Sequence, residues 1–258
     1  MFNNFAILVA SCDKYSDLWD GFFLQLNANL SLPVKKYLLT NNKKYDGQFA
    51  GNVESICIGD DLNWSDSLSR ALGCIKEQKI FLIVEDFFIS HPINEISMRD
   101  VINFSLSENS QLIHFENLPG SIQSRFPAYT KCEPGMPYLV GVCGIWDREY
   151  LLALLINGEN PWQFEVYGSY RAQFSANRIY CLKSRLFDFR NMIQKGAWVK
   201  SNLVWAKKNN IPLNFEVRPI QTSTFFYLKD FYFQLILHCP WRIRMAFLNF
   251  FRKVFASY

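Results

Sequence analysis

Two adjacent acids, Glu85 and Asp86, directly follow the apolar run 81–84 and are the residues in this sequence best suited to chemistry. Four consecutive apolar residues are typical of a central parallel strand covered on both faces, and ligands of α/β sheets bind at the carboxyl ends of such strands. An acid pair is costly to bury there unless a cation or hydrogen-bond donors receive it. Mg2+ or Mn2+ would join these carboxylates to substrate phosphates. The alternative is that the acids cap the next helix or pair with an arginine.

A second acidic group precedes an expected helix. Asp60 and Asp61 are followed by Trp64 in a loop, an arrangement suited to contacting a ribose or a base. Turn and helix-cap roles explain the same acids equally well, and we expect Ser65 to cap the helix.

The segment 158–172 combines acidic, basic and aromatic residues with a proline and two glycines, which is unusual for a simple connection. Glu165 is suited to remove a proton from an acceptor hydroxyl, and Arg171 or Arg148 to balance phosphate charge, with Trp162 beside them as a further contact. The structural alternative makes Glu165 a first-turn helix acid and Trp162 a core residue.

Short apolar runs alternate with amphipathic stretches, which predicts an α/β fold with a mainly parallel sheet. Strands are expected at 5–10, 36–40, 53–59, 80–89, 111–115 and 138–146, and helices at 18–26, 64–78, 93–106 and 147–156. The stretch 119–137, with four prolines, predicts a loop long enough to be functional.

Composition and motifs exclude several classes of protein. The chain has 258 residues and 50% hydrophobic content, ample for a packed core, and its seven cysteines without a CxxC pair indicate neither a disulfide framework nor a zinc ribbon. The three histidines are isolated, and the absence of a P-loop, of GxGxxG after the first strand and of GxSxG argues against NTPases, dinucleotide enzymes and α/β-hydrolases. Residues 1–224 are neutral overall, so we expect no nucleic-acid partner.

The net charge of +4 resides in the segment 225–258, where aromatic residues are mixed with five basic residues and one acid. Pro240 divides this segment into two expected helices, and the second places Arg242, Asn249 and Lys253 on one face. A basic aromatic helix of this kind suits an anionic membrane surface, and the alternative is a contact with the main domain or within a homodimer. We expect no spanning helix and no N-terminal leader.

The order of these elements resembles bacterial glycosyltransferases of the GT-A fold, particularly those of lipopolysaccharide and capsule assembly. The resemblance covers about residues 1–200 and is carried by ILVASCDKYSDLWDGFF, YLLTN, IGDDLNWSDSL, IFLIVEDFFI and GIWDREYLLALLINGENPWQFEVYGS. It implies a Rossmann-like, mixed and mainly parallel sheet flanked by helices, to which the C-terminal segment adds a helical amphipathic appendage.

The resemblance also implies roles for the candidate residues. Nucleotide binding would fall to Ala10, Ser11, Asp13, Tyr15 and Asn41, joined by Asp60, Asp61 and Trp64. Asp86 would be the direct metal ligand, with Glu85 beside it, although the family pattern is Asp-any-Asp and this sequence has Glu-Asp-Phe. In inverting members an acid on a later loop is the base, which corresponds to Glu165; in a retaining enzyme this assignment fails.

We therefore expect a glycosyltransferase domain over residues 1–224 and a membrane-surface or dimer-contact tail over 225–258. The expected activity is transfer of a hexosyl group from a nucleotide sugar, with UDP as the expected nucleotide, to a hydroxyl of a lipid-carried or growing surface glycan, aided by Mn2+ or Mg2+. The expected location is the cytoplasm, at the inner face of the inner membrane. Two alternatives are a nucleotidyltransferase of similar fold, whose Gly-rich basic loop this sequence lacks, and a noncatalytic glycan-binding or scaffold protein.

Overall fold

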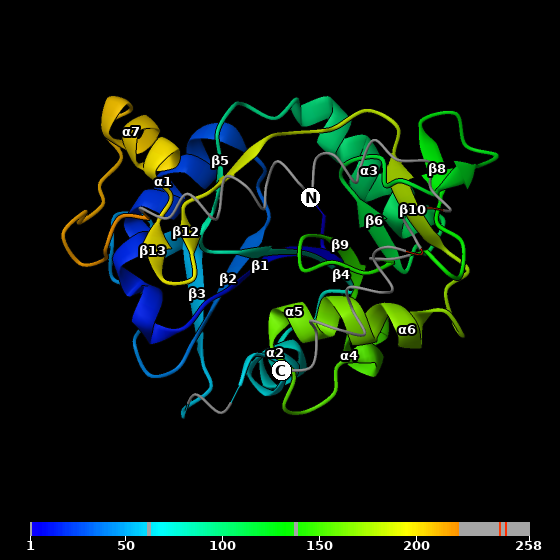
Figure 1. Cartoon of the computed structure of the whole chain (residues 1–258), viewed down its shortest axis with the longest axis horizontal. Helices are drawn as coiled ribbons and strands as arrows, with labels where there is room; N and C mark the ends of the chain where they lie inside the picture. The colour runs from blue at the N-terminus through cyan, green and yellow to red at the C-terminus, as the bar shows by residue number, and fades with distance from the viewer. Residues whose placement is uncertain (1, 61–62, 137–138, 222–242, 244–245, 247–258) are drawn as a thin grey trace.

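The apolar runs form the strands of one central sheet, and the amphipathic stretches form the helices that cover it. The computed structural model describes residues 2–60, 63–136 and 139–221, together with residues 243 and 246. Within this part of the chain, nine strands form a mixed sheet in the order β3-β2-β1-β4-β9-β6-β10-β8-β7 (Figure 1). The mixed, mainly parallel α/β fold is therefore confirmed.

Most elements are short. In sheet order the strands are β3 (Val53–Cys57), β2 (Lys35–Thr40), β1 (Phe5–Ala10), β4 (Lys79–Val84), β9 (Gly144–Asp147), β6 (Leu112–His114), β10 (Ile179–Leu182), β8 (Tyr129–Lys131) and β7 (Ile122–Gln123). Two small antiparallel sheets pair β5 (Phe87–Ile89) with β11 (Phe189–Asn191) and β12 (Ile193–Gln194) with β13 (Ala197–Trp198). The helices are α1 (Trp19–Asn29), α2 (Trp64–Cys74), α3 (Glu95–Ser107), α4 (Arg148–Leu154), α5 (Pro161–Gln163), α6 (Ser169–Ala172) and α7 (Lys200–Lys208), with 3-10 turns η1 (Asp13–Leu18) and η2 (Ala50–Asn52) and a π-helical turn η3 (Phe164–Gly168).

Strand β1 shows why a central strand of this sheet is apolar throughout. Phe5, Ile7 and Val9 belong to the hydrophobic cluster on one face, whereas Ala6 and Leu8 belong to the cluster on the other face. Successive side chains of a strand point to opposite faces, so a strand with helices on both sides needs apolar residues at every position.

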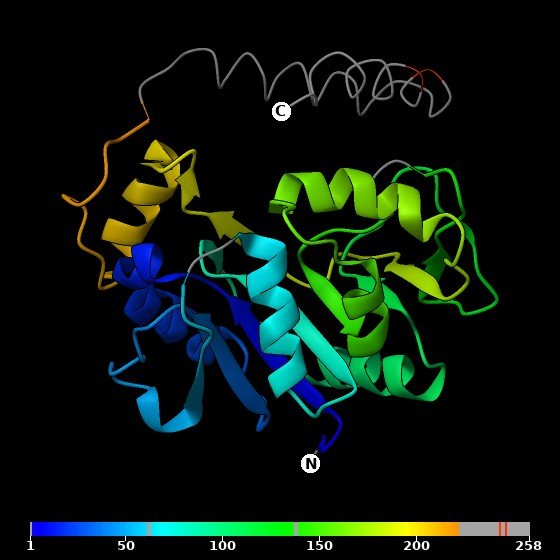
Figure 2. The same cartoon turned by 90° about the horizontal axis from the view of Figure 1, so that it is seen from below.

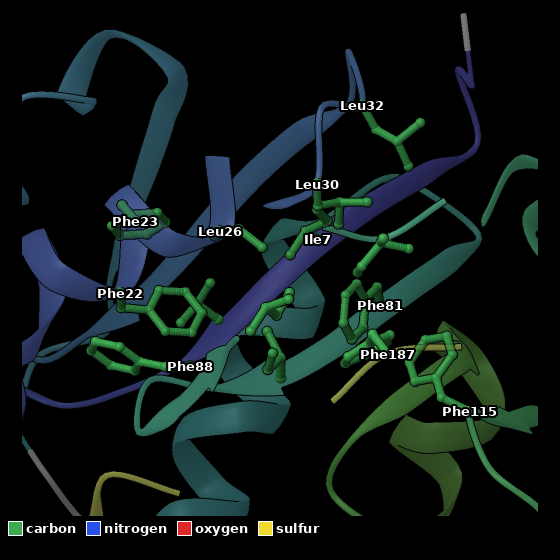
Figure 3. Packing of buried hydrophobic residues seen from close by; sticks show 14 of the residues in the cluster. Ile7, Phe22, Phe23, Leu26, Leu30, Leu32, Phe81, Phe88, Phe115 and Phe187 are labelled. Carbon is green, nitrogen blue, oxygen red and sulfur yellow. The ribbon is translucent and has the colours of Figure 1, made fainter. Parts of the chain in front are cut away.

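Helices α1 and α3 cover one face, and α2, α4, α5 and α6 cover the other (Figure 1, Figure 2). On the first face, Phe22 of α1 meets Phe88 edge to face with ring centroids 5.9 Å apart, beside Ile7 and Phe81 (Figure 3). Edge-to-face aromatic pairs add to the stabilisation that burial gives. The high phenylalanine content is thus explained largely by this core.

The carboxyl ends of β1, β2 and β4 lie at the same edge of the sheet because these strands run parallel. Ala10 lies in register with Leu39 on one side and Val84 on the other, so the residues that follow each strand emerge together. The chain leaves β1 toward β2 but enters β4 from β3, and ligands of open α/β sheets bind where the strand order reverses in this way. The antiparallel strand β9 begins at this edge too, since Gly144 pairs with Leu82.

The start of α2 differs from the sequence expectation. The N-cap is Asn63, whose side chain accepts a hydrogen bond from the Asp66 amide at 2.9 Å. Ser65 is instead a fully buried helical residue that donates to the Ile156 carbonyl at 2.6 Å. The prediction of Ser65 as the cap was wrong because this tertiary contact takes its hydroxyl.

The strand expected at 138–146 is shorter than predicted, because only Gly144–Asp147 pair as β9. Before β9, the Val140 amide donates to the Ser169 hydroxyl at 3.1 Å and the Val142 amide to the Glu165 carboxylate at 3.4 Å. These backbone donors are therefore satisfied by side chains of α6 and η3 rather than by a neighbouring strand. The stretch 119–137, expected as a loop, contains β7 and β8 at the far edge of the sheet.

The segment after β10 returns to the carboxyl-end edge. The Met192 amide donates to the Asp86 carbonyl at 2.7 Å, next to the pairing of β11 with β5. Farther along, the Trp198 and Ile220 backbones form a parallel bridge beside the β12–β13 hairpin. Residues 186–221 thus form a cover over the ends of β1 and β4, and we call them the cover segment.

No helix among residues 2–60, 63–136 and 139–221 is long and apolar enough to cross a membrane. The membrane-surface and homodimer predictions rest on the tail at 225–258, which lies outside the described residues apart from 243 and 246.

A buried lysine fastens the opposite end of the sheet and generates a prediction about stability. Lys79 is 0% exposed, and its ammonium donates to Asn109 Oδ1 at 3.0 Å, to the Ser110 carbonyl at 2.6 Å and to Asp147 Oδ2 at 2.9 Å. Lys79→Met leaves these acceptors without their donor, so we expect the free energy of unfolding in urea to fall by about 3 kcal/mol.

The matched control is Lys76→Met, because Lys76 is exposed on the connection between α2 and β4. We expect a change within about 0.5 kcal/mol there. Equal effects of the two substitutions would contradict the buried-pair explanation.

Candidate functional site

Glu85 and Asp86 form a turn directly after β4, at the edge where the parallel strands end. The Glu85 side chain is only 7% exposed, and its Oε1 accepts a hydrogen bond from the Ser11 hydroxyl at 3.1 Å. The same Ser11 oxygen accepts from the Trp19 indole Nε1 at 2.8 Å. A chain of two hydrogen bonds from α1 therefore fixes the orientation of the Glu85 carboxylate.

The acid pair is held where its negative charge is poorly compensated. Burial raises the pKa of Glu85 well above its ordinary value, and the neighbouring Asp86 charge raises it further. Burial also raises the pKa of Asp86 to about 7. Arg218 opposes both shifts through its positive charge, without cancelling either. A ligand that brings positive charge to this edge would therefore be bound favourably.

The loops that follow β1 and β2 are tied to each other by Asp13 and Asn41. The Asp13 amide donates to Asn41 Oδ1 at 3.0 Å, and the Asp13 carboxylate accepts from the amides of Asn41 and Asn42 at 3.0 Å each and of Lys43 at 3.1 Å. Hydrogen bonds from several amides to one carboxylate are charge-assisted and fix both loops. Asp13 thus acts as a structural clamp on the nucleotide loop that the resemblance implies.

Arg218, which no sequence pattern singles out, connects the cover segment to η1. Its Nε and Nη2 donate to the Asp17 carboxylate at 2.9 and 2.6 Å, and Nη2 also donates to the Lys14 carbonyl at 2.9 Å. Its guanidinium lies 4.4 Å from the centroid of the Tyr15 ring. About two hundred residues separate these groups in sequence, so a local spacing pattern could not have predicted this contact.

Glu165 lies on the π-helical turn η3 and faces the segment that precedes β9. Its Oε1 is 3.4 Å from the Val142 amide, and burial raises its pKa to about 7. Glu165 and Gly141 line a cavity of about 300 Å³, together with His114 and Phe87, the residue after Asp86. A carboxylate whose pKa is near neutrality is suited to accept a proton at physiological pH. π-helical turns are frequent at functional sites.

The residues around the start of α2 lie beneath η3. The Trp64 ring packs against Phe164 with centroids 5.3 Å apart, and Asp60 is exposed in the preceding loop. Asp61 lies outside the described residues. Trp162 is 69% exposed on α5, so it is available to a ligand and is not a core residue.

The two arginines proposed for phosphate are used elsewhere. Arg171 donates twice to the Glu159 carboxylate and twice to the Leu154 carbonyl, which fixes α6 to the end of α4. Arg148 begins α4, and its amide bonds to Gln78 at the start of β4, roughly 20 Å of strand away from Glu85. The structure therefore brings together Ala10, Ser11, Asp13, Tyr15, Asn41, Glu85 and Asp86, and it places Arg148 at the opposite edge.

The acid pair has the chemistry of a site for Mg2+ or Mn2+. Carboxylate oxygens are hard ligands, and the burial of Glu85 and Asp86 leaves them in need of a cation. Within the described part of the chain, no three His, Cys, Asp or Glu side chains are grouped to hold a metal ion. Substrate phosphates and water would therefore supply the remaining ligands, which is the usual pattern for Mg2+.

Comparisons with known proteins bear on the fold. No protein-family model and no curated protein matches the sequence. Among solved structures, the complex of an S. aureus TarS fragment with UDP-GlcNAc matches with a TM-score of 0.52 at 13% identity, over 82% of this chain and 68% of that chain. TarS is a GT-A-type glycosyltransferase. The fold of this chain is GT-A-like.

Two further TarS structures share the GT-A-like fold. The complex of the fragment with UDP matches with a TM-score of 0.52 at 12% identity, over 71% of this chain and 59% of that chain. The fragment described without a ligand matches with a TM-score of 0.50 at 14% identity, over the same shares of the two chains. Identities this low establish the fold alone. The chain spans about three-fifths of the length of these two TarS fragments.

The Arg218–Asp17 pair should hold the cover segment in place. Its side chains are 13% and 17% exposed. Arg218→Lys keeps the charge but loses the two-pronged geometry, so we expect the free energy of unfolding in urea to fall by about 1 to 2 kcal/mol. Limited trypsin proteolysis of the folded protein should also become faster at Lys207 and Lys208, which precede residue 218 in the cover segment.

Arg99→Lys is the control, because Arg99 pairs with Glu95 on the surface of α3 with both side chains at least 40% exposed. Exposed pairs of this kind contribute little. A smaller loss of stability from Arg218→Lys than from Arg99→Lys would refute the prediction that Arg218 holds the cover segment in place.

Proposed function

We propose that the chain transfers a sugar from a nucleotide-sugar donor to a hydroxyl group of a glycan acceptor. The observation that carries the proposal is the arrangement of carboxylates at one edge of a GT-A-like sheet. The pair Glu85–Asp86, of which Glu85 is buried and Asp86 half-buried, lies on the β4 side, and Glu165 faces a cavity that begins at the next residue, Phe87. Displacement at a sugar carbon needs a stabilised leaving group and a base for the incoming hydroxyl, and these acids meet the two needs separately.

The donor nucleotide is proposed to bind over the loops that follow β1 and β2. Asp13 and Asn41 hold those loops in one conformation, so little conformational entropy is lost when a nucleotide binds. Tyr15 offers an aromatic ring there, backed by Arg218. UDP is the proposed nucleotide because structures of the same fold are complexes with UDP and UDP-GlcNAc.

Asp86, assisted by Glu85, would hold Mg2+ or Mn2+ at the donor diphosphate. When bound, such an ion neutralises charge that develops on the leaving diphosphate. Ser11 keeps the Glu85 carboxylate turned toward the same edge through their 3.1 Å hydrogen bond. Arg218 adds a fixed positive charge that favours the ionised form of both acids.

Glu165 is proposed to act as the base of an inverting displacement. The acceptor hydroxyl oxygen forms a bond to the anomeric carbon, and the bond from that carbon to the donor phosphate oxygen breaks with its electron pair staying on the diphosphate. The hydroxyl proton passes to Glu165, whose Oε1 the Val142 amide holds at 3.4 Å. The burial that raises the pKa of Glu165 to about 7 makes it a stronger base than an ordinary carboxylate.

The finer predictions about biology remain proposals. Lipopolysaccharide or capsule assembly is proposed from the resemblance alone. A lipid-carried acceptor and binding at the inner membrane surface are proposed from the tail at 225–258, which lies outside the described residues apart from 243 and 246. Trp162 is proposed as an acceptor contact because its ring is exposed beside η3.

The deciding experiment follows release of UDP from a panel of UDP-sugars by the purified full chain with Mn2+. Asp86→Asn removes one negative charge from the acid pair at constant size, so we expect turnover to fall at least about 100-fold without loss of folded protein. Circular dichroism melting checks the folded state.

Asp100→Asn on the exposed face of α3 is the matched control and should keep full turnover. Absence of release from every UDP-sugar by the unaltered chain would argue against sugar transfer, and unchanged turnover in Asp86→Asn would refute the assignment of the acid pair.

The pH dependence of transfer tests Glu165 separately. Only the deprotonated carboxylate accepts a proton, so the rate should rise with pH and level off above an apparent pKa of about 7. Glu165→Gln should lower the rate by about 100-fold to 10,000-fold and abolish this rise. Glu54→Gln on the exposed side of the edge strand β3 serves as the control.

Two outcomes would show that the base is elsewhere. A rising limb that persists in Glu165→Gln would assign the titration to the acid pair at residues 85 and 86. Retention of anomeric configuration in the product would exclude a single inverting displacement.

A further inference from the structure

The cavity beside Glu165 has an aromatic wall with one open face. Phe87 and Phe189 stack with ring centroids 4.4 Å apart and 9° between their planes, across the pairing of β5 with β11. Despite this stacking, Phe189 remains 39% exposed, and both rings line the cavity. A large apolar ring left open at the mouth of a cavity is typical of a binding surface rather than of a core.

The charged groups of the cavity compensate one another. Arg185 is the cation of its lining, and it is already paired with Glu116 and, at 2.8 Å, with Asp188. Glu165 adds a second carboxylate to the lining. A phosphate group entering the cavity would meet two carboxylates and a cation that is already neutralised, which disfavours an anionic ligand.

His114 gives the cavity a neutral polar group. Burial lowers the pKa of His114 to about 4, so the ring is uncharged at neutral pH. Nε2 lies 3.1 Å from the Leu139 carbonyl, which only accepts, so Nε2 carries the proton and Nδ1 is an acceptor. In the described part of the chain no group bonds to this Nδ1. A hydroxyl of a ligand is the complement that such an acceptor needs.

We propose that this cavity binds one uncharged pyranose ring of the acceptor, stacked on the open face of Phe189 with its hydroxyls toward His114 and Glu165. The inference rests on the proposed function, since it names the acceptor class for the same site. It also predicts that an acceptor which carries a phosphate, such as a polyol phosphate, does not bind in this cavity.

The size of the cavity limits the occupant to a single ring. Its volume of about 300 Å³ lies at the lower end of the range for ligand pockets, roughly 300–1,000 Å³. A sugar ring has one apolar C–H face and a polar rim, which matches an aromatic wall opposite carboxylate and imidazole acceptors. The remainder of a longer glycan would extend past Phe189 into solvent.

Saturation-transfer NMR on the full chain tests the proposal, with UDP and Mg2+ present. The probes are methyl glycosides of glucose, galactose and N-acetylglucosamine, and glycerol phosphate represents the polyol phosphates. We expect saturation of ring protons of at least one glycoside and none of glycerol phosphate. Phe189→Ala should reduce the glycoside signal at least about fivefold.

Phe189→Tyr keeps the aromatic face and should retain the glycoside signal. Phe174→Ala is the matched control, because Phe174 is 93% exposed after α6 and does not line the cavity. Calorimetric affinity for UDP with Mn2+ should be the same in all these proteins, which shows that the donor side remains folded.

Saturation of glycerol phosphate equal to that of the glycosides would overturn the proposal. So would a glycoside signal that survives in Phe189→Ala, or no glycoside signal in a chain that binds UDP. If the chain binds glycosides in the cavity but has no affinity for UDP, the proposed sugar transfer is refuted and the neutral-sugar site is supported.

Discussion

The placement of two adjacent carboxylates at the buried end of a central strand is the constraint on which the rest of this site depends. Glu85 and Asp86 are neighbours in sequence, the charge of Asp86 raises the pKa of Glu85, and burial makes such repulsion stronger than it is in water. The surroundings supply partial relief, through backbone hydrogen bonds at both residues, the Ser11 hydroxyl at Glu85 and the positive charge of Arg218. The charged forms of the two acids are therefore disfavoured in the folded chain, and a cationic ligand would relieve this electrostatic cost. Such disfavoured charges are common at functional sites.

A part of the chain that is distant in sequence covers the two acids. The Met192 amide bonds to the Asp86 carbonyl, and Arg218 binds Asp17 in the first loop. Both contacts come from the cover segment, which also carries Phe189, the open ring of the cavity wall. One segment therefore covers the acid pair, supports Tyr15 and shapes the cavity before Glu165, so a change in its position would alter both the acid pair and the cavity.

The sequence predicts the parts of the molecule that follow from local periodicity. The apolar runs at 81–84 and 5–10 identify central strands, and parallel order then places Ser11 near Glu85 without further information. The backbone at 139–143 is different, because its amides bond to side chains of Ser169 and Glu165. The apolar pattern of these residues is typical of a strand. Only their hydrogen bonds to Ser169 and Glu165, which are distant in sequence, show that they do not pair as one. Arg218 is beyond prediction for the same reason, since its partner lies two hundred residues away.

Burial raises the pKa of Glu165 and of Asp86 to similar values, yet the two acids have different electrostatic surroundings. Asp86 has an adjacent carboxylate, so a cation bound there would lower its pKa and leave it ionised. Glu165 has a single backbone donor, and the cavity before it contains an uncharged imidazole and an arginine that is already paired. The pKa of Glu165 is therefore set by burial and by the Val142 amide, and neither acid of the pair is among its causes. The proposed base gains from this separation, because a carboxylate with no charged carboxylate beside it can accept a proton without repulsion from the acid pair.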